Sequence, residues 1–380
     1  MKLHRVPPFL WGSAFVGLML FSFVTYHGSS SVHASRTIAI TDGWGRAVTV
    51  PCNPARVICS GPGCLRYLTY LQSQHRIVAV DDMEKRRERF KARPYALANP
   101  QFKKYPLFGE FRGHDNPELI AVLDPQPEVI FKTHGKMGHD PDELQDKTGI
   151  PVVVLEYGNL TTHRKDMYRS IRSMGTVMGT QERAEALIAF FDAVIADLNR
   201  RTEHIPEDKK KTCYLGGIAF KGPHGFQSTE PAYPPFLFTN SRHVAYTPTS
   251  GLREAQHADV SKEKIIEWDP EVIFIDLSTI MADPKADALY ELQHDPAFQH
   301  LRAVTSRDVY GVFPYNWYAQ NYGSILANAY YVGTLLYPEQ FKDINPRDKA
   351  NEIYTYLVGK PLFEQMNNEF KGLAFTRFLY

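Results

Sequence analysis

The chemistry of this chain is expected in loops that follow short apolar runs, where cations and aromatic side chains stand close together. In an open sheet of parallel strands, ligands bind outside the carboxyl ends of the strands, so these loops should meet. Aromatic rings can cover the apolar rim of a bound molecule while guanidinium or ammonium groups neutralise its carboxylates or catecholates. The pattern suits an anionic metal chelate, and the candidate ligand-binding residues are Arg112, Lys132, His134, Lys221, His224, Tyr315, Trp317 and Tyr318.

Two other ligand chemistries stay open on the same loops. His134, His139 and His224 could ligate a bare metal ion together with tyrosine or carboxylate partners. A small oxyanion such as molybdate or tungstate would be held by backbone N–H groups and by hydroxyls such as Ser60 and Ser278, with little need for aromatic walls. The sequence contains no C-x-x-C motif, and we expect neither a resident cofactor nor a metal ion held by the protein itself.

The sequence gives little support for an enzyme. It contains neither G-x-S-x-G nor H-E-x-x-H, so no catalytic residues are expected. Gly61-Pro62-Gly63, with Asp81 after the next apolar run, has the spacing of a dinucleotide-binding turn, but Arg66 occupies the third glycine position, where close packing needs a small residue. We therefore interpret this loop as a strand-to-helix turn whose backbone N–H groups face an anion.

Hydrophobic spacing predicts the elements that position these loops. A hairpin is expected around Asp42-Gly43-Trp44-Gly45, and Tyr330, Tyr331 and Tyr337 are interpreted as core residues. Apolar residues at helical spacing predict a long helical span within residues 162–204. The charged segment 82–106 is interpreted as a surface excursion. Short β-branched runs separated by helical or loop segments predict mainly parallel strands at residues 57–60, 77–80, 129–131, 152–155 and 212–218.

An internal repeat indicates two related halves. Residues 116–131 read NPELIAVLDPQPEVIF and residues 261–274 read SKEKIIEWDPEVIF. Each starts with a good N-cap residue, continues to Asp-Pro and ends in the same Glu-Val-Ile-Phe strand. Glu118 and Glu263 therefore fall at the second position of equivalent helices. A cleft between two such halves is the natural place for a ligand.

Composition narrows the class of protein. The chain has 43 Lys+Arg against 42 Asp+Glu, and this formal net charge of +1 argues against nucleic-acid binding through a basic surface. Four cysteines in 380 residues cannot form a disulfide scaffold that replaces a core. Whether Cys52, Cys59, Cys64 and Cys213 pair with one another stays open.

The N-terminal segment has the build of a secretory signal peptide. Residues 1–34 begin with basic residues, run nearly apolar from Phe9 to Tyr26, and end in Ser31-Val32-His33-Ala34, a small-x-small cleavage site. We expect cleavage after Ala34, which would bring the formal charge to −1. The alternative is an uncleaved anchor, because roughly 18 apolar residues can just span a bilayer.

Several short motifs, in order and spacing, resemble one known family. The sequence is similar to the substrate-binding proteins of ABC importers for iron–siderophores, haem and cobalamin, over most of residues 37–360. The resemblance rests on DGWGR (42–46), PARVI (54–58), PEVIF (127–131 and 270–274), TGIPVVVLEY (148–157) and LRAVTSRDVYGV (301–312). The segment 216–236 differs from the best-known siderophore binders, which leaves the ligand open.

The resemblance implies an α/β fold with two Rossmann-like three-layer lobes, mainly parallel sheets and a long interdomain helix. It implies a monomer that captures a small metal complex, most favourably an iron chelate, and delivers it in the periplasm to an ABC permease of the inner membrane. Glu118 and Glu263 would be the acids that dock onto permease arginines. Haem, cobalamin, a bare metal or an oxyanion are alternative ligands, and an exported enzyme is the alternative class. The implied division is a signal peptide at 1–34, an N-terminal α/β lobe at 35–160, a linking helical segment at 161–206 and a C-terminal α/β lobe at 207–380.

Overall fold

The computed structural model describes residues 36–378, apart from residues 87, 221, 223, 247–256 and 281–286. The expected signal segment and the candidate ligand residue Lys221 therefore lie outside the described residues. Within the described ranges, no helix combines the length and the apolar character that crossing a membrane requires.

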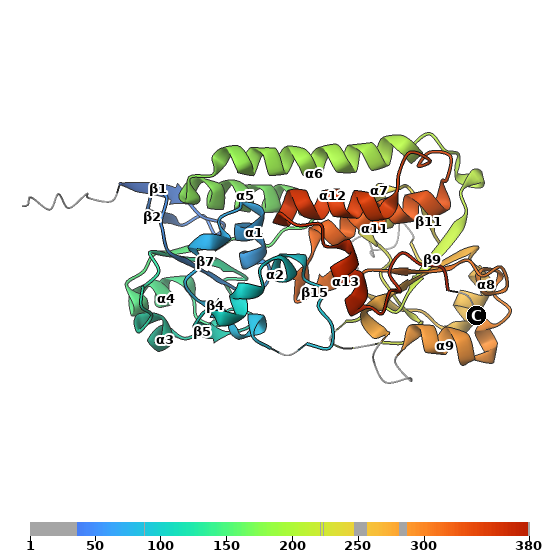
Figure 1. Cartoon of the computed structure of the whole chain (residues 1–380), viewed down its shortest axis with the longest axis horizontal. Helices are drawn as coiled ribbons and strands as arrows, with labels where there is room; N and C mark the ends of the chain where they lie inside the picture. The colour runs from blue at the N-terminus through green and yellow to red at the C-terminus, as the bar shows by residue number, and fades with distance from the viewer. Residues whose placement is uncertain are drawn as a thin grey trace, which may run out of the picture. The chain divides into compact units, whose positions relative to one another are not determined.

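The first half of the chain contains a parallel sheet in the order β3-β7-β8, as the alternating pattern predicts (Figure 1). The predicted strand at 77–80 is largely wrong, because Ile77 forms only an isolated bridge with Val57 and the strand itself begins at Val80. The strands are β1 (Thr37–Thr41), β2 (Ala47–Pro51), β3 (Val57–Ser60), β4 (Val80–Asp81), β5 (Leu107–Glu110), β6 (His114–Asp115), β7 (Val129–Thr133) and β8 (Val152–Leu155). The helices are α1 (Cys64–Tyr70), α2 (Pro94–Ala98), α3 (Pro117–Ala121) and α4 (Pro141–Thr148).

Side chains alternate between the two faces of this sheet. Ile58 and Ile130 point to a small core that also contains Ile120 of α3 and Leu144 of α4. Val57, the neighbour of Ile58, belongs instead to the larger core on the other face, because successive residues of a strand point in opposite directions. The sheet therefore lies between two layers of helices.

The second half repeats this plan with the parallel sheet β11-β9-β13-β14. Its strands are β9 (Thr212–Gly216), β10 (Ser228–Thr229), β11 (Arg242–His243), β12 (Ala258–Asp259), β13 (Val272–Asp276), β14 (Val309–Val312), β15 (Asn316–Trp317) and β16 (Ala319–Gln320). Its helices are α7 (Pro234–Phe238), α8 (Lys262–Trp268), α9 (Ala288–His294), α10 (Arg302–Thr305), α11 (Tyr322–Leu336), α12 (Pro346–Val358) and α13 (Phe363–Glu369).

Two long helices separate the halves, as the periodicity within 162–204 predicts. They are α5 (Arg164–Met178) and α6 (Gln181–Thr202), and Gly179, with φ 68°, ends the first of them. The 22 residues of α6 span roughly 33 Å at 1.5 Å per residue. Figure 1 shows α6 running beside elements of both halves. Its buried stripe, which includes Leu187, Phe191 and Leu198, joins the larger core.

The larger core is continuous from the first sheet to the second. Tyr330, Tyr331 and Tyr337 lie in it, which confirms their interpretation as core residues. All four cysteines are free thiols, so the halves are held together by packing and polar contacts.

The interpretation of segment 82–106 as a surface excursion is wrong. Phe90, Tyr95 and Phe102 are almost completely buried in the larger core. Glu84 and Arg93 form a buried ion pair at 2.6 Å. The charges of this segment had suggested a solvated loop, whereas the structure pairs part of them inside the protein.

A buried guanidinium joins the two halves. Arg66 of α1 is fully buried, and its guanidinium carbon lies 3.9 Å from the ring centroid of Tyr322 and 4.7 Å from that of Tyr67. It also donates to the backbone carbonyl of Gln320 in the second half. Burial raises the pKa of Tyr322 to about 12, so these phenols stay neutral and attract the cation through their ring faces.

Substitution of Arg66 tests the contribution of these contacts between the halves. Arg66→Ala should lower the free energy of unfolding by roughly 3 kcal/mol, since it removes two close cation–π contacts and a charged hydrogen bond. Arg66→Met should cost less because it keeps the apolar stem. Urea denaturation would measure both. Arg172→Ala is the control, because Arg172 forms an exposed pair with Glu185 and should contribute little. A Met variant as stable as the wild type would contradict a stabilising role of the guanidinium.

Candidate functional site

A cavity of about 840 Å³ lies between the two halves, and we call it the cleft cavity. Its described lining follows the carboxyl ends of β4 and β5, which belong to a separate sheet β4-β5-β6 of the first half, and of β9, β13 and β14 in the parallel sheet of the second half. The first half contributes Met83, Arg86, Glu88, Arg89, Phe111 and Arg112. The second half contributes Ala219, Phe220, Gly222, Ser278, Asn316, Trp317 and Tyr318.

The glycine turn after β3 brings strand ends close together. Gly61 has φ 83°, and a Cβ there would lie 2.6 Å from the carbonyl oxygen of Thr133 at the end of β7. Only glycine fits such a close approach in this conformation. The loop therefore serves as a strand-to-helix turn, as interpreted from sequence, whereas an anion facing its backbone N–H groups stays a prediction.

Cations dominate the charge of the cleft cavity. Arg86, Arg89 and Arg112 are exposed at its lining, against Glu88 as the one acid among the described lining residues. The guanidinium of Arg86 lies 3.8 Å from the ring centroid of Phe111 and pairs with Asp82 at 2.7 Å. That of Arg112 lies 5.1 Å from the same ring. Rings and cations thus alternate on this wall, as binding of an anion with an apolar rim requires.

Glu88 is largely occupied by other groups. Its Oε1 accepts a hydrogen bond from Nε1 of Trp317 at 2.9 Å, and its Oε2 pairs with Arg93 at 2.9 Å. The Trp317 ring also packs on Phe90, with 4.4 Å between ring centroids. These contacts fix Trp317 of the second half against the first half, so this aromatic wall is held rigidly.

Tyr318 makes a second polar bridge between the halves. Its hydroxyl donates to Oδ2 of Asp81 at 2.5 Å. Burial, followed by the nearby charge of Glu84, raises the pKa of Asp81 to about 7, although the hydrogen bond from Tyr318 opposes this rise. Burial and the charge of Asp81 also raise the pKa of Tyr318. The carboxyl group of Asp81 and the hydroxyl of Tyr318 are therefore held together beneath the wall of the cleft cavity.

The structure places the candidate ligand residues in different surroundings. Arg112, Trp317 and Tyr318 line the cleft cavity. Lys132 is completely buried, forms an ion pair with Asp115 and donates to the carbonyl oxygen of Gly113 at 2.8 Å. Among the described residues, neither Lys132 nor the other three candidates, His134, His224 and Tyr315, belongs to the cavity lining. Their contact with ligand stays a prediction.

Tyr315 and His134 are held by neighbouring groups. The Tyr315 hydroxyl donates to the buried carboxylate of Glu230 at 2.6 Å. The His134 ring packs on Tyr157, with 4.6 Å between centroids, and its Nδ1 has no hydrogen-bond partner among the described residues. Burial, followed by the positive charges of Arg66 and Lys132, lowers the pKa of His134, so this ring favours the neutral form.

Sequence reasoning missed Arg86, Arg89 and Met83. All three lie in the segment interpreted as a surface excursion. Asp81 follows the predicted strand at 77–80, and the two arginines come within eight residues of it. Extending the strand-end rule a few residues along the chain would have found them.

The acids at the repeated helix starts occupy matching, exposed positions. Glu118 is the second residue of α3, whose cap Asn116 accepts from Leu119 N at 2.9 Å. Glu263 is the second residue of α8, whose cap Ser261 accepts from Lys264 N at 3.3 Å. The equivalence inferred from the repeat is therefore present in the structure.

Comparison with known proteins identifies the family. The model of the family described as periplasmic binding protein matches residues 76–314. The chain belongs to this family. It is the substrate-binding component of an ABC transporter, which confirms the family, the two-lobed fold and the transport role inferred from sequence.

Individual periplasmic binding proteins are similar at low sequence identity. The molybdate-binding protein MolA of Haemophilus influenzae is 22% identical over 340 residues, which cover 83% of this chain and 89% of MolA. A periplasmic solute binding protein of Veillonella parvula has a TM-score of 0.68 at 21% identity, covering 88% of this chain and 97% of that one. Molybdate-bound MolA has a TM-score of 0.61 at 18% identity, with 84% and 98% covered. These similarities support the shared fold.

The raised pKa of Asp81 predicts a pH dependence of stability. The pKa of an aspartate in an unfolded chain is about 3.9. The contribution of protonated Asp81 to the free energy of unfolding is therefore fully present below about pH 4. It is lost as the pH rises through the folded value of about 7. Asp81→Asn should remove this loss of folding stability with rising pH, while keeping an oxygen that accepts the hydrogen bond from Tyr318.

Chemical denaturation between pH 4 and pH 8 would measure the effect as the difference between the variant and the wild type. Asp208→Asn is the control, because Asp208 is highly exposed and should leave the profile parallel to that of the wild type. A constant difference for Asp81→Asn across this range would show that Asp81 does not titrate in the predicted window.

Proposed function

We propose that this periplasmic binding protein captures an anionic metal chelate of the iron–siderophore type in the cleft cavity and delivers it to its ABC permease. The observation that carries the proposal is a single cavity lined by three arginines and by the rings of Phe111, Phe220, Trp317 and Tyr318. Capture requires no bond to break, and the protein acts after export through a cleaved signal peptide.

The size of the cleft cavity favours a chelate over a small ion. Its volume of about 840 Å³ lies in the range of roughly 300–1,000 Å³ that suits ligands of drug size. A tetrahedral oxyanion needs only a few backbone N–H groups and hydroxyls around it. Four aromatic rings would then have no apolar surface of the ligand to cover.

The charges support an anionic ligand. Glu88 is engaged with Trp317 and Arg93, and Arg86 with Asp82, whereas Arg89 and Arg112 are exposed residues of the cavity lining. A catecholate or carboxylate chelate carries oxygens that a guanidinium fork binds in pairs. The rings beside these cations can cover the backbone of the chelator.

A small oxyanion is the second candidate. The similarity to MolA, a molybdate-binding protein, favours it. Ser278 lines the cleft cavity, where its hydroxyl donates to the carbonyl oxygen of Gly217 at 3.3 Å and accepts from Ala219 N at 3.2 Å. The buried Oγ of Ser60 has no hydrogen-bond partner among the described residues. Both candidates place the ligand between the halves, so binding experiments separate them.

Titration of the purified protein tests the proposal directly. Trp317 lines the cleft cavity, so a bound ferric chelate should quench tryptophan fluorescence saturably and raise the melting temperature. The panel would contain ferric tris-catecholate, ferric hydroxamate, haem, cobalamin, molybdate, tungstate and Zn²⁺. Tight binding of molybdate without binding of any chelate would contradict the proposal, and turnover of any of these compounds would indicate an enzyme.

Substitution of the cleft arginines gives a specific prediction. Arg112→Ala and Arg89→Ala should each weaken binding of ferric tris-catecholate by about tenfold or more, since each loses a hydrogen bond from a charged donor to the anion. The salt dependence of binding should become shallower in both variants. Isothermal titration calorimetry at several salt concentrations would measure this.

Arg200→Ala serves as the matched control for these substitutions. Arg200 is a highly exposed arginine of α6 that pairs with Asp197, and it does not belong to the described lining of the cleft cavity. Its loss should leave chelate affinity unchanged. Equal affinity in Arg112→Ala and Arg200→Ala would show that the cleft cations do not bind the ligand.

A docking role of Glu118 and Glu263 predicts an effect on uptake that is separate from ligand binding. Glu118→Lys or Glu263→Lys should abolish uptake by whole cells and leave ligand affinity intact, because both carboxylates are exposed and outside the described cavity lining. Glu182→Lys is the matched control: Glu182 is likewise an exposed second residue of a helix, α6, and shares only the helix-dipole effect. Uptake that survives both reversals would contradict a docking role.

A further inference from the structure

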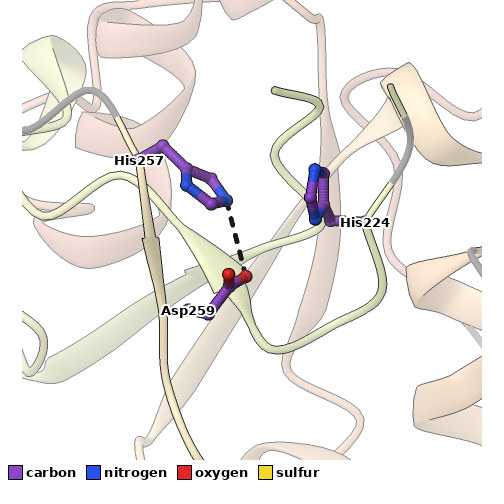
Figure 2. A group of neighbouring side chains, drawn as sticks. All are labelled: His224, His257 and Asp259. Carbon is purple, nitrogen blue, oxygen red and sulfur yellow. Dashed lines mark ion pairs between the residues drawn. The ribbon is translucent and has the colours of Figure 1, made fainter. Parts of the chain in front are cut away.

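We infer that His224, His257 and Asp259 form a binding site for a divalent transition-metal ion of the Zn²⁺ class. The site is separate from the binding of chelate in the cleft cavity. One ligand atom of each side chain lies within 4.8 Å of those of the other two. Figure 2 shows the three side chains on two stretches of chain, with His257 and Asp259 on one and His224 on the other.

The spacing of His257 and Asp259 suits a metal ion between them. Nε2 of His257 lies 3.4 Å from Oδ1 of Asp259 (Figure 2). Two ligand atoms about 2.0–2.1 Å from a tetrahedral ion stand roughly 3.4 Å apart. The Nε2 atom is buried and has no hydrogen-bond partner among the described residues, so the observed pair leaves its polar atom unsatisfied. A shared cation would satisfy both groups.

His224 is oriented as a third ligand. Its Nε2 lies 2.8 Å from the carbonyl oxygen of Phe220, to which a protonated Nε2 donates. That hydrogen bond fixes the neutral tautomer and leaves the lone pair on Nδ1, as is usual for metal-binding histidines whose other nitrogen donates to a backbone carbonyl. The centroids of the two imidazoles are 5.0 Å apart.

The ligand set selects the class of metal. Two imidazoles and one carboxylate favour Zn²⁺, Co²⁺ or Ni²⁺ over Mg²⁺ and Ca²⁺, which prefer oxygen ligands. The Asp259 side chain is 66% exposed, so water can reach the ion and complete its coordination. The carboxylate supplies one negative charge beside two neutral rings, and a bound divalent ion would leave the site with a net charge of about +1.

The position of the site suggests what the ion would do. Asp259 of β12 pairs with Ser228 of β10, and His224 lies in the loop that leads to β10. The ring of His257 stacks on Phe220, with centroids 4.7 Å apart, and Phe220 lines the cleft cavity. A metal ion would therefore link β12 to the loop that leads to β10, and would hold Phe220 in place at the wall of the cavity.

Metal titration tests the site without any chelate, so its outcome is independent of the proposed transport ligand. The purified full chain, without a histidine tag and stripped of metal, should bind one Zn²⁺ per chain in calorimetry and retain it through gel filtration with elemental analysis. Mg²⁺ and Ca²⁺ should not compete. Co²⁺ should give the visible absorption of a tetrahedral site with nitrogen and oxygen ligands.

Three single substitutions locate the ion. His224→Ala, His257→Ala and Asp259→Asn should each weaken Zn²⁺ binding by at least about tenfold. Asp259→Asn changes an exposed side chain, so it tests the site even if the histidine variants unfold. His163→Ala is the matched control, because His163 and Asp166 also approach to 3.0 Å but belong to no such three-residue cluster among the described residues. Failure to bind one Zn²⁺ per chain, or binding that Asp259→Asn leaves unchanged, would overturn the inference.

Discussion

The arrangement of the two halves depends on a buried cation, Arg66, which pairs with no carboxylate among the described residues. Arg66 reaches from the first half to Tyr322 and to the backbone of Gln320 in the second. Gln320 in turn donates its backbone N–H to the hydroxyl of Tyr157 at 2.5 Å. Removing a guanidinium from water is costly, and only the matching of ring faces and carbonyl oxygen offsets that cost. Such a contact tolerates little relative movement, so it holds the halves at a fixed distance.

The contacts of Arg66 between the halves also help to explain why the cleft cavity is largely preformed. The polar bridges of Trp317 to Glu88 and of Tyr318 to Asp81 continue these contacts toward the cavity, and α6 runs beside both halves as a stiff strut (Figure 1). The larger core is also continuous between the two sheets. A wide hinge motion would break these contacts together. The fold therefore favours a largely preformed site that closes by small movements of its loops.

The prediction from sequence worked where the signal was local. The β-branched runs at 57–60, 129–131, 152–155 and 212–218 form parallel strands, although the run at 77–80 largely does not, and the residues at helical spacing form α5 and α6. The repeat placed Glu118 and Glu263 at equivalent helix positions. It failed for segment 82–106, because charged residues are usually solvated and no local pattern reveals a buried partner. Glu84 and Arg93 find each other only when the chain is folded.

The sequence by itself determined the family, the strand ends and the equivalent helix starts that carry Glu118 and Glu263, since each depends on residues close together in the chain. Only the tertiary structure decided which strand-end residues share a cavity. Lys132 follows the rule as well as Arg112 does, yet Asp115 neutralises it in the interior. Likewise, His224 and His257 are far apart in sequence, and only the packing of β12 beside β10 brings them together. Burial and pairing depend on distances through space, which spacing along the chain does not encode.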